Sequence, residues 1–150
     1  MIKDGSFSQC SEMTRLTLGG GLEEIGEEAF AECSSLHEIF IPDGVKMIKK
    51  AVFGCCSQLN IVTLGDGLEE IGEGAFAECS SLHEITIPNA VKAIKKAAFG
   101  RCSQLNYVTL GEELEEIGEW AFGECTSLRE ITIPPPSRRL STGHSFVARS

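Results

Sequence analysis

Cysteine and histidine side chains are typical zinc ligands, and in this sequence they recur at a fixed spacing. The segment AFAECSSLHEI occurs at residues 29–39 and again at 75–85, so Cys33 precedes His37, and Cys79 precedes His83, by four residues. Thiolate and imidazole are common ligands of structural zinc. Six of the seven cysteines follow one another at intervals of 23 residues: Cys10, Cys33, Cys56, Cys79, Cys102 and Cys125. The fold decides whether they converge.

The same interval of 23 residues separates large apolar side chains, which identifies the chain as an internal repeat. Phenylalanine keeps the interval at six positions: Phe7, Phe30, Phe53, Phe76, Phe99 and Phe122. A second period of 46 residues lies on top, because residues 33–78 and 79–124 are identical at 35 of 46 positions. The repeating unit is therefore one coil of the chain, and successive coils form similar pairs.

Each coil is expected to contribute one short strand. In residues 79–101 the pattern Leu82-x-x-Ile85-x-Ile87 ends in alternating apolar residues, which is typical of a strand, and Pro88 ends it. No unit this short can bury its apolar side alone, so we expect the coils to stack with strands about 4.8 Å apart. This predicts a solenoid of about five to six coils over residues 1–136, beginning with a half-coil at 1–9. A degenerate half-coil and mobile tail are expected at 137–150.

The pattern L-x-x-I-x-I-P-x-x-V-x-x-I-x-x-x-A-F-x-x-C is similar to the BspA-like class of leucine-rich repeats, over roughly residues 2–134. The resemblance implies a right-handed coil stack with a parallel sheet on one face, used for adhesion or protein recognition. The fold class is then an α/β-type solenoid dominated by β structure, with little regular helix. Many members of this class are surface proteins.

Stacking argues against metal or disulfide chemistry in the cysteine column. Stacked thiols point the same way at about the 4.8 Å strand spacing, whereas a disulfide needs Cβ atoms about 3.8 Å apart. A straight column also lacks the four converging ligands of a closed zinc site. His37 and His83 should face outward, two coils or about 10 Å apart. We therefore expect neutral, buried thiols that act as packing groups, with no metal site and no cofactor.

Neither catalysis nor binding to anionic polymers is indicated. The sequence lacks a Gly-x-Ser-x-Gly elbow and a phosphate-binding loop, and its Glu-Glu pairs are repeat positions on an open wall. We expect that the protein is not an enzyme. The net charge of −9 argues against binding to nucleic acid or an anionic membrane. No apolar run suggests a signal peptide or membrane span, so a cytoplasmic location is expected, or the cell surface if the chain is a fragment.

Two columns of charged residues are expected to alternate in sign along the stack. The first contains Glu23, Lys46, Glu69, Lys92 and Glu115. The second contains Glu27, Lys50, Glu73, Lys96 and Glu119. Neighbouring opposite charges would fix the register of the coils more than they stabilise it, because exposed ion pairs contribute only about 0.2 to 1 kcal/mol. Cys55 lies outside the cysteine column and is expected to be exposed and prone to intermolecular disulfide formation.

The outward face of the predicted sheet is the best candidate for binding a protein partner. Phe40, Ile61 and Tyr107 are apolar where equivalent positions of other coils are polar, so we expect them to centre a contact patch. Further residues of this face complete the patch: His37, His83, Thr63, Thr86 and Thr109. Two alternatives stay open. Threonine and aromatic residues simply suit strands, and a threonine ladder could bind an ordered surface such as ice.

Three further features suggest other contacts. Trp120, the only tryptophan, is either a cap on the last coil or a second contact point. Its column is filled elsewhere by Glu28, Ala51, Gly74 and Ala97. Ser141 ends an RRLS sequence that resembles a basophilic kinase motif, where phosphate would add negative charge beside two arginines. The open solenoid ends suggest, as an alternative to recognition, a structural or adhesive array in which copies stack into a homo-oligomer.

Overall fold

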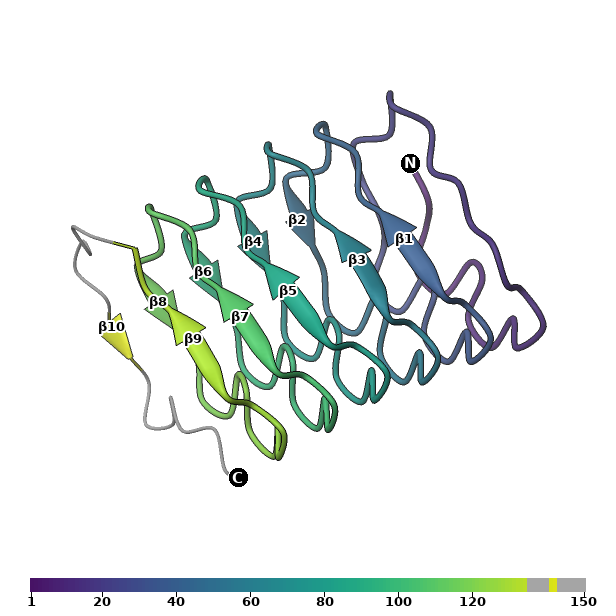
Figure 1. The fold of residues 1–150 in the computed structure, drawn as a ribbon. Coiled ribbons are helices and arrows are strands. Elements are labelled where there is room, and N and C mark those ends of the chain that lie inside the picture. Colours follow the sequence, from purple (N-terminus) through teal and green to yellow (C-terminus); the bar gives the residue numbers. More distant parts are fainter. Residues whose placement is uncertain (135–140, 143–150) are drawn as a thin grey trace.

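The computed structural model describes residues 1–134 and 141–142 of the chain, and these residues form a stack of coils around a common interior (Figure 1). They contain strands and turns but no helix. The strands, in chain order, are β1 (Glu38–Phe40), β2 (Met47–Ile48), β3 (Ile61–Thr63), β4 (Glu70–Ile71), β5 (Glu84–Thr86), β6 (Ala93–Ile94), β7 (Tyr107–Thr109), β8 (Glu116–Ile117), β9 (Glu130–Thr132) and β10 (Ser141–Thr142). The predicted β-dominated coil stack with parallel strands is confirmed.

Each full coil has a three-residue strand on one wall and a two-residue strand on the opposite wall. The three-residue strands alternate between exposed and inward residues, as in the burial of Ile39 between Glu38 and Phe40. All pairing is parallel, with a register of 23 residues between successive coils up to β9, for example Glu38 with Ile61 and Met47 with Glu70. β10 pairs with β8 at an offset of 25 residues, Ser141 with Glu116. The sequence predicted a sheet on one wall only. The structure adds a second, five-stranded sheet in the order β10-β8-β6-β4-β2.

The three-residue strands do not form one continuous sheet. β1 pairs with β3, and β5 pairs with β7 and β9, but β3 and β5 are not hydrogen-bonded. At equivalent places Ile41 N–H donates to Thr63 at 2.8 Å, and Ile87 N–H donates to Thr109 at 2.8 Å. On the opposite wall β4 and β6 remain paired. The coils therefore separate on one side only, between β3 and β5, and we call this place the sheet break.

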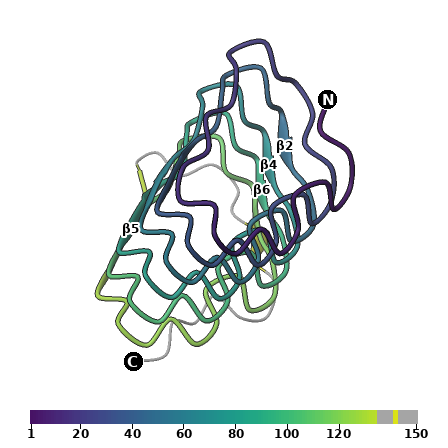
Figure 2. The ribbon, with the colours of Figure 1, turned by 90° about the vertical axis from the view of Figure 1, so that its right-hand side faces the viewer.

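Side-chain columns that run the length of the stack fill the core, and Figure 2 shows the coils one behind another around it. The six phenylalanine rings stack with centroids 5.3 to 5.6 Å apart and planes within 10° of parallel. All but Phe7 are essentially fully buried. The leucine, isoleucine and cysteine columns lie against them, so every coil buries apolar surface against both neighbours, as expected for a solenoid.

Each coil turns its corners with two residues in the left-handed backbone region. One column has φ between 58° and 64° and contains Gln9, Glu32, Cys55, Glu78, Arg101 and Glu124. The other has φ between 53° and 63° and contains Gly5, Glu28, Ala51, Gly74, Ala97 and Trp120. Positive φ is uncommon outside glycine and costs on the order of 1 kcal/mol per residue. Packing of the apolar columns on both sides must hold these corners in place.

The two-coil period has a packing reason at the end of the outward strands. A Cβ added to Gly65 would lie 2.6 Å from the carbonyl oxygen of Ile41, so only glycine allows this close approach. In the same pair of coils, Asp43 Oδ1 accepts a hydrogen bond from the backbone N–H of Asp66 at 2.9 Å. Asn89 and Glu112 repeat this contact two coils later at 3.2 Å. A coil with glycine after its outward strand thus packs closely against the coil before it, whose Asp or Asn side chain accepts a backbone hydrogen bond.

The expectation of alternating ion pairs within the two charge columns is wrong. Among the described residues, no two members of either column lie within 4.0 Å as an ion pair. The lysines that do pair belong to a neighbouring column and reach obliquely, Lys49 to Glu24 at 3.2 Å and Lys95 to Glu116 at 2.9 Å. Long side chains lean along the wall, so the charged atoms need not meet where the Cα atoms stack.

Candidate functional site

The apolar side chains of the candidate contact patch all occupy outward positions of the three-residue strands. Phe40 is 58% exposed, Ile61 53% and Tyr107 47%, each beside an inward residue that is buried. Large apolar side chains this exposed cannot be explained by packing within the chain. They are surface features that the strand alternation creates.

Phe40 and Ile61 lie at one hollow on the sheet face. The hollow has a volume of about 400 Å³ and is also lined by Glu38, Thr63 and Leu16. The register places Phe40 opposite Thr63 and Ile61 opposite Glu38, so the two apolar side chains stand diagonally on paired strands. Long and aromatic side chains at diagonal positions are within reach of each other. This pair is the part of the predicted patch that the fold brings together.

Tyr107 lies on the far side of the sheet break, on β7 between Glu84 of β5 and Glu130 of β9. A second hollow of about 350 Å³ occupies the break itself, with Ile61 and Thr63 on one edge and Glu84 and Thr86 on the other. The predicted patch is therefore two surfaces separated by the break, and Ile61 lines the hollows on both sides of β3.

The threonine ladder is interrupted. Thr86 pairs with Thr109, and Thr109 pairs with Thr132, in regular parallel register. Thr63 is not paired with Thr86, because the sheet break lies between them, and Phe40 occupies the next position of the column. An ordered lattice such as ice would require evenly spaced hydroxyl groups along the whole face. The structure offers a run of three such positions.

His37 and His83 are exposed at the starts of the outward strands, as expected. Nδ1 of His83 lies 2.8 Å from the carbonyl oxygen of Ser81, so this nitrogen carries the proton and donates. Among the described residues, no group of three or more His, Cys, Asp or Glu side chains is arranged to hold a metal ion.

Five members of the cysteine column are buried and their thiols each have a hydrogen-bond acceptor, whereas Cys10, at the start of the column, is half-buried. Sγ of Cys56 donates to the carbonyl oxygen of Phe30 at 3.2 Å, and Sγ of Cys79 donates to that of Phe53 at 3.3 Å. The same contact, 26 residues back along the chain, recurs at Cys33, Cys102 and Cys125. Burial raises the pKa of the Cys56 thiol to about 12, which keeps it neutral. The column is structural, and each thiol adds a second hydrogen bond to a phenylalanine carbonyl that already accepts one from the backbone N–H three residues later.

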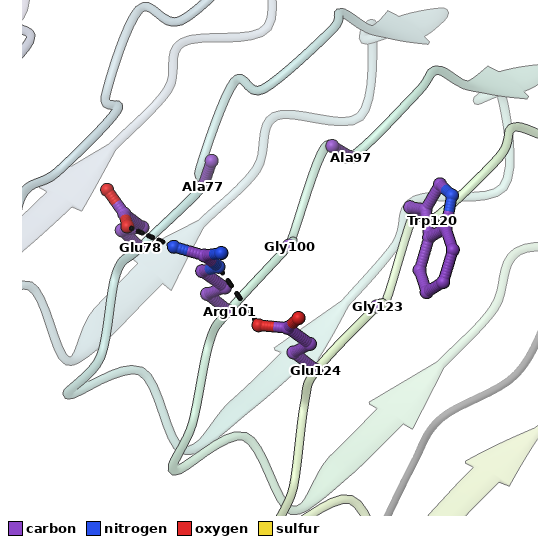
Figure 3. Close-up of a pocket in the computed structure, with 8 residues that line it drawn as sticks. All are labelled: Ala77, Glu78, Ala97, Gly100, Arg101, Trp120, Gly123 and Glu124. Atoms are coloured by element: carbon purple, nitrogen blue, oxygen red, sulfur yellow. Dashed lines mark hydrogen bonds and ion pairs between the residues drawn. The ribbon is translucent and has the colours of Figure 1, made fainter.

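A different site lies on the wall formed by the left-handed corners, where Glu78, Arg101 and Glu124 line up across three coils (Figure 3). Nε of Arg101 donates to Oε2 of Glu124 at 2.9 Å, and its terminal nitrogen donates to Oε1 of Glu78 at 3.4 Å. Beside this row is a hollow of about 350 Å³ that ends at Trp120. Sequence reasoning singled out Trp120 but missed the ion row, although Arg101 is the one basic residue in a column that contains three glutamates.

Cys55 belongs to the same row and is half-buried, which corrects the expectation that it is exposed and reactive. Its thiol donates to Oε2 of Glu78 at 2.9 Å. This hydrogen bond, with partial burial and the nearby carboxylate charge, raises the pKa of Cys55 to about 11. The thiolate that would attack a disulfide is correspondingly scarce at neutral pH.

The candidate phosphorylation site falls at the edge of the described residues. Ser141 belongs to β10, whose backbone pairs with Glu116 of β8, while Arg138 and Arg139 of the motif lie outside the described residues. The boundary expected near residue 136 also lies outside them. The part of the chain that the structure describes holds no helix capable of spanning a bilayer.

Comparison with known proteins finds one leucine-rich repeat family and several solved structures of leucine-rich proteins. The family described as BspA type leucine rich repeat region matches six copies over residues 1–104 and 69–146. A leucine-rich repeat protein of T. pallidum is 30% identical with a TM-score of 0.89, covering 95% of this chain and 65% of that one. A leucine rich cell surface protein of Faecalibacterium prausnitzii is 32% identical with a TM-score of 0.74, covering 77% of this chain and 30% of that one.

A third solved structure, a leucine-rich repeat protein of Bacteroides ovatus, is 23% identical with a TM-score of 0.53 and supports the fold alone. This chain therefore spans 65% and 30% of the length of the first two relatives. No curated protein matches the chain in sequence at a significant level.

Proposed function

The chain belongs to the BspA-type leucine-rich repeat family, and from this premise we propose that it is a non-catalytic module that binds a protein partner through the outward face of its three-residue strands. The observation that carries the proposal is the pair Phe40 and Ile61, which are more than half exposed and line one hollow. Exposed aromatic and aliphatic side chains beside a concave surface are typical anchors of protein interfaces.

Tyr107 extends the proposed contact surface across the sheet break. Its ring stands between two glutamates, and tyrosine there provides both an apolar face and a hydroxyl group. The outward threonines and the two histidines surround these anchors with polar groups, as in an interface rim. The two hollows of this face are lined mainly by apolar, threonine and carboxylate side chains, a mixture that suits recognition of a protein surface.

The repeat itself supplies substitutions that test this surface without disturbing the fold. Phe40→Thr places in β1 the residue found in the same column at Thr63, and Ile61→Glu and Tyr107→Glu reproduce Glu38 and Glu84. Ala93→Glu is the matched control, because it lies on the opposite sheet in register with Glu70 and Glu116.

The experiment is affinity capture from a lysate of the source organism, with quantitative comparison of the wild type, the triple variant and the control. We expect the triple variant Phe40→Thr, Ile61→Glu, Tyr107→Glu to lose partners that the wild type and Ala93→Glu retain. Equal recovery by the triple variant and the wild type would show that the partner does not bind this face. Circular dichroism of each variant confirms that the coil stack is intact.

The second candidate is an array of copies joined through the solenoid ends. The ring of Phe7 stacks on Phe30 with one face and is 42% exposed, so another coil could cover it. Light scattering separates the two proposals. A molar mass that stays at one chain as the concentration rises would eliminate the array, and a rising mass would support it.

A further inference from the structure

The hollow that ends at Trp120 has the composition of a binding site, and it lies on a different wall from the proposed contact face. Its floor consists of the smallest side chains of three adjacent coils: Ala77, Ala97, Gly100 and Gly123. One side is the row of Glu78, Arg101 and Glu124, and the end wall is Trp120 (Figure 3). We call it the Trp120 hollow. Small floor residues leave the space of about 350 Å³ that larger ones would fill.

The backbone holds Trp120 in this place at a cost. Trp120 has φ of 56°, a conformation that bulky residues rarely adopt, whereas Gly74 in the same column adopts it freely. A Cβ added to Gly123 would lie 2.8 Å from Cε3 of Trp120, so the indole rests where a side chain of residue 123 would be. The ring nevertheless stays 46% exposed. Glu28, Ala51 and Ala97 adopt the same corner conformation in other coils, so what distinguishes this corner is the large, half-exposed aromatic ring that it carries.

The row beside the hollow carries one more negative than positive charge. Arg101 is shared between Glu78 and Glu124, so two carboxylates face one guanidinium. The second oxygen of Glu78 accepts the thiol of Cys55, whereas within the described residues Oε1 of Glu124 has no hydrogen-bond donor. Because Trp120 and Glu124 lie on the same coil on opposite sides of Gly123, an apolar ring and an acceptor oxygen flank one position of the floor.

We propose that the Trp120 hollow binds an arginine side chain of a basic peptide segment in a partner. The apolar stem of the arginine lies on the glycine and alanine floor, and its guanidinium stacks on the indole of Trp120. Oε1 of Glu124 accepts a hydrogen bond from the guanidinium. The net charge of −9 adds a general attraction for basic segments. This site does not include Phe40, Ile61 or Tyr107, so experiments on it test arginine binding separately from the proposed function.

Trp120 is the only tryptophan, so its fluorescence reports directly on this hollow. The probe is the peptide Ac-Gly-Gly-Arg-Gly-Gly-amide, titrated at low salt. Two peptides of the same length serve as controls, one with citrulline, which keeps the shape of arginine without the charge, and one with leucine. We expect saturable change in the Trp120 emission with the arginine peptide and at least about fivefold weaker binding of the citrulline peptide.

Two variants locate the binding. Trp120→Ala recreates the residue found at Ala51 and Ala97, and Glu124→Gln removes one charge. Amide NMR signals of Gly100 and Gly123 follow binding in the variant without tryptophan. We expect at least about fivefold weaker binding in Trp120→Ala and about threefold in Glu124→Gln, with Glu23→Gln on another wall unchanged.

Each possible result decides the proposal. Equal binding of the arginine and citrulline peptides would show that charge is not recognised, and tighter binding of the leucine peptide would show an apolar anchor instead. Unchanged binding in Trp120→Ala would reduce the effect to general attraction by an acidic protein. A complete absence of saturation for all peptides would also overturn the proposal.

Discussion

The stack of phenylalanine rings should dominate the stability of the solenoid, and Phe76→Ala tests this. The Phe76 ring is fully buried and stacks on Phe53 at 5.4 Å and on Phe99 at 5.3 Å. Replacing a buried phenylalanine by alanine typically lowers the free energy of unfolding by about 3 to 5 kcal/mol. Because each coil is stabilised by both neighbours, one missing ring weakens two coil interfaces at once.

Phe7→Ala is the matched control, since Phe7 lies at the end of the same stack. It has one stacking partner, Phe30 at 5.4 Å, and is 42% exposed. The loss there should be about 1 to 2 kcal/mol, because roughly half the apolar burial and one ring pair instead of two are removed.

The assay is urea denaturation of both variants and the wild type, followed by circular dichroism and by the fluorescence of Trp120. With a total stability of about 5 to 15 kcal/mol for a domain of this kind, the two losses are easily distinguished. A difference between Phe76→Ala and Phe7→Ala of less than about 1 kcal/mol would refute the reasoning that stacked burial in the interior holds the coils together.

Three further predictions follow from single contacts. The backbone N–H groups of Ile41 and Ile87 donate to the next coil, whereas the equivalent N–H of Leu64 faces the sheet break. By NMR, the Leu64 amide should exchange its hydrogen at least about tenfold faster than the amides of Ile41 and Ile87. Equal protection of the three amides would contradict an open sheet break. Gly65→Ala should lower the free energy of unfolding by about 1 to 3 kcal/mol because its Cβ meets the Ile41 carbonyl, while Gly19→Ala, with open space around it, should be neutral in the same denaturation assay. A pKa of about 11 leaves Cys55 on the order of one part per thousand thiolate at pH 8. Glu78→Gln replaces the carboxylate whose hydrogen bond and charge raise this pKa, so it should speed the reaction of Cys55 with a disulfide reagent about tenfold. Unchanged kinetics would show that Glu78 does not control the thiol.

Much of the fold could be predicted because it depends on columns that repeat at one interval. The apolar pattern at Leu82, Ile85 and Ile87 predicts which side chains of each three-residue strand and its flanks point into the core, and all three are buried. The burial of the cysteines follows from their place between the phenylalanine and leucine columns. Repetition turns a weak local pattern into a strong one.

Other features carry too little signal in the sequence. The two-residue strands such as Met47–Ile48 are too short to show an alternation, so the second sheet was not foreseen. The sheet break leaves the repeat pattern unchanged, because Val62 and Leu64 are as apolar as their equivalents. Ion pairing was predicted wrongly because a column predicts where Cα atoms lie, whereas Lys49 and Lys95 bring their charges to neighbouring columns.

The sheet break also gives the molecule a preferred axis of bending. Coils joined by backbone hydrogen bonds on every wall resist bending. The coils of β3 and β5 lack these bonds between their outward strands, and they are joined on the wall of β4 and β6 and along the corners, where the N–H of Phe76 donates to Ala98. The hydrogen-bonded parts of the two coils would act as the hinge, and the sheet break would widen or narrow. Phe40 and Ile61 lie on one side of the sheet break and Tyr107 lies on the other. A partner that grips all three residues would therefore set the curvature of the whole stack, and the curvature would in turn select the size of the partner that fits.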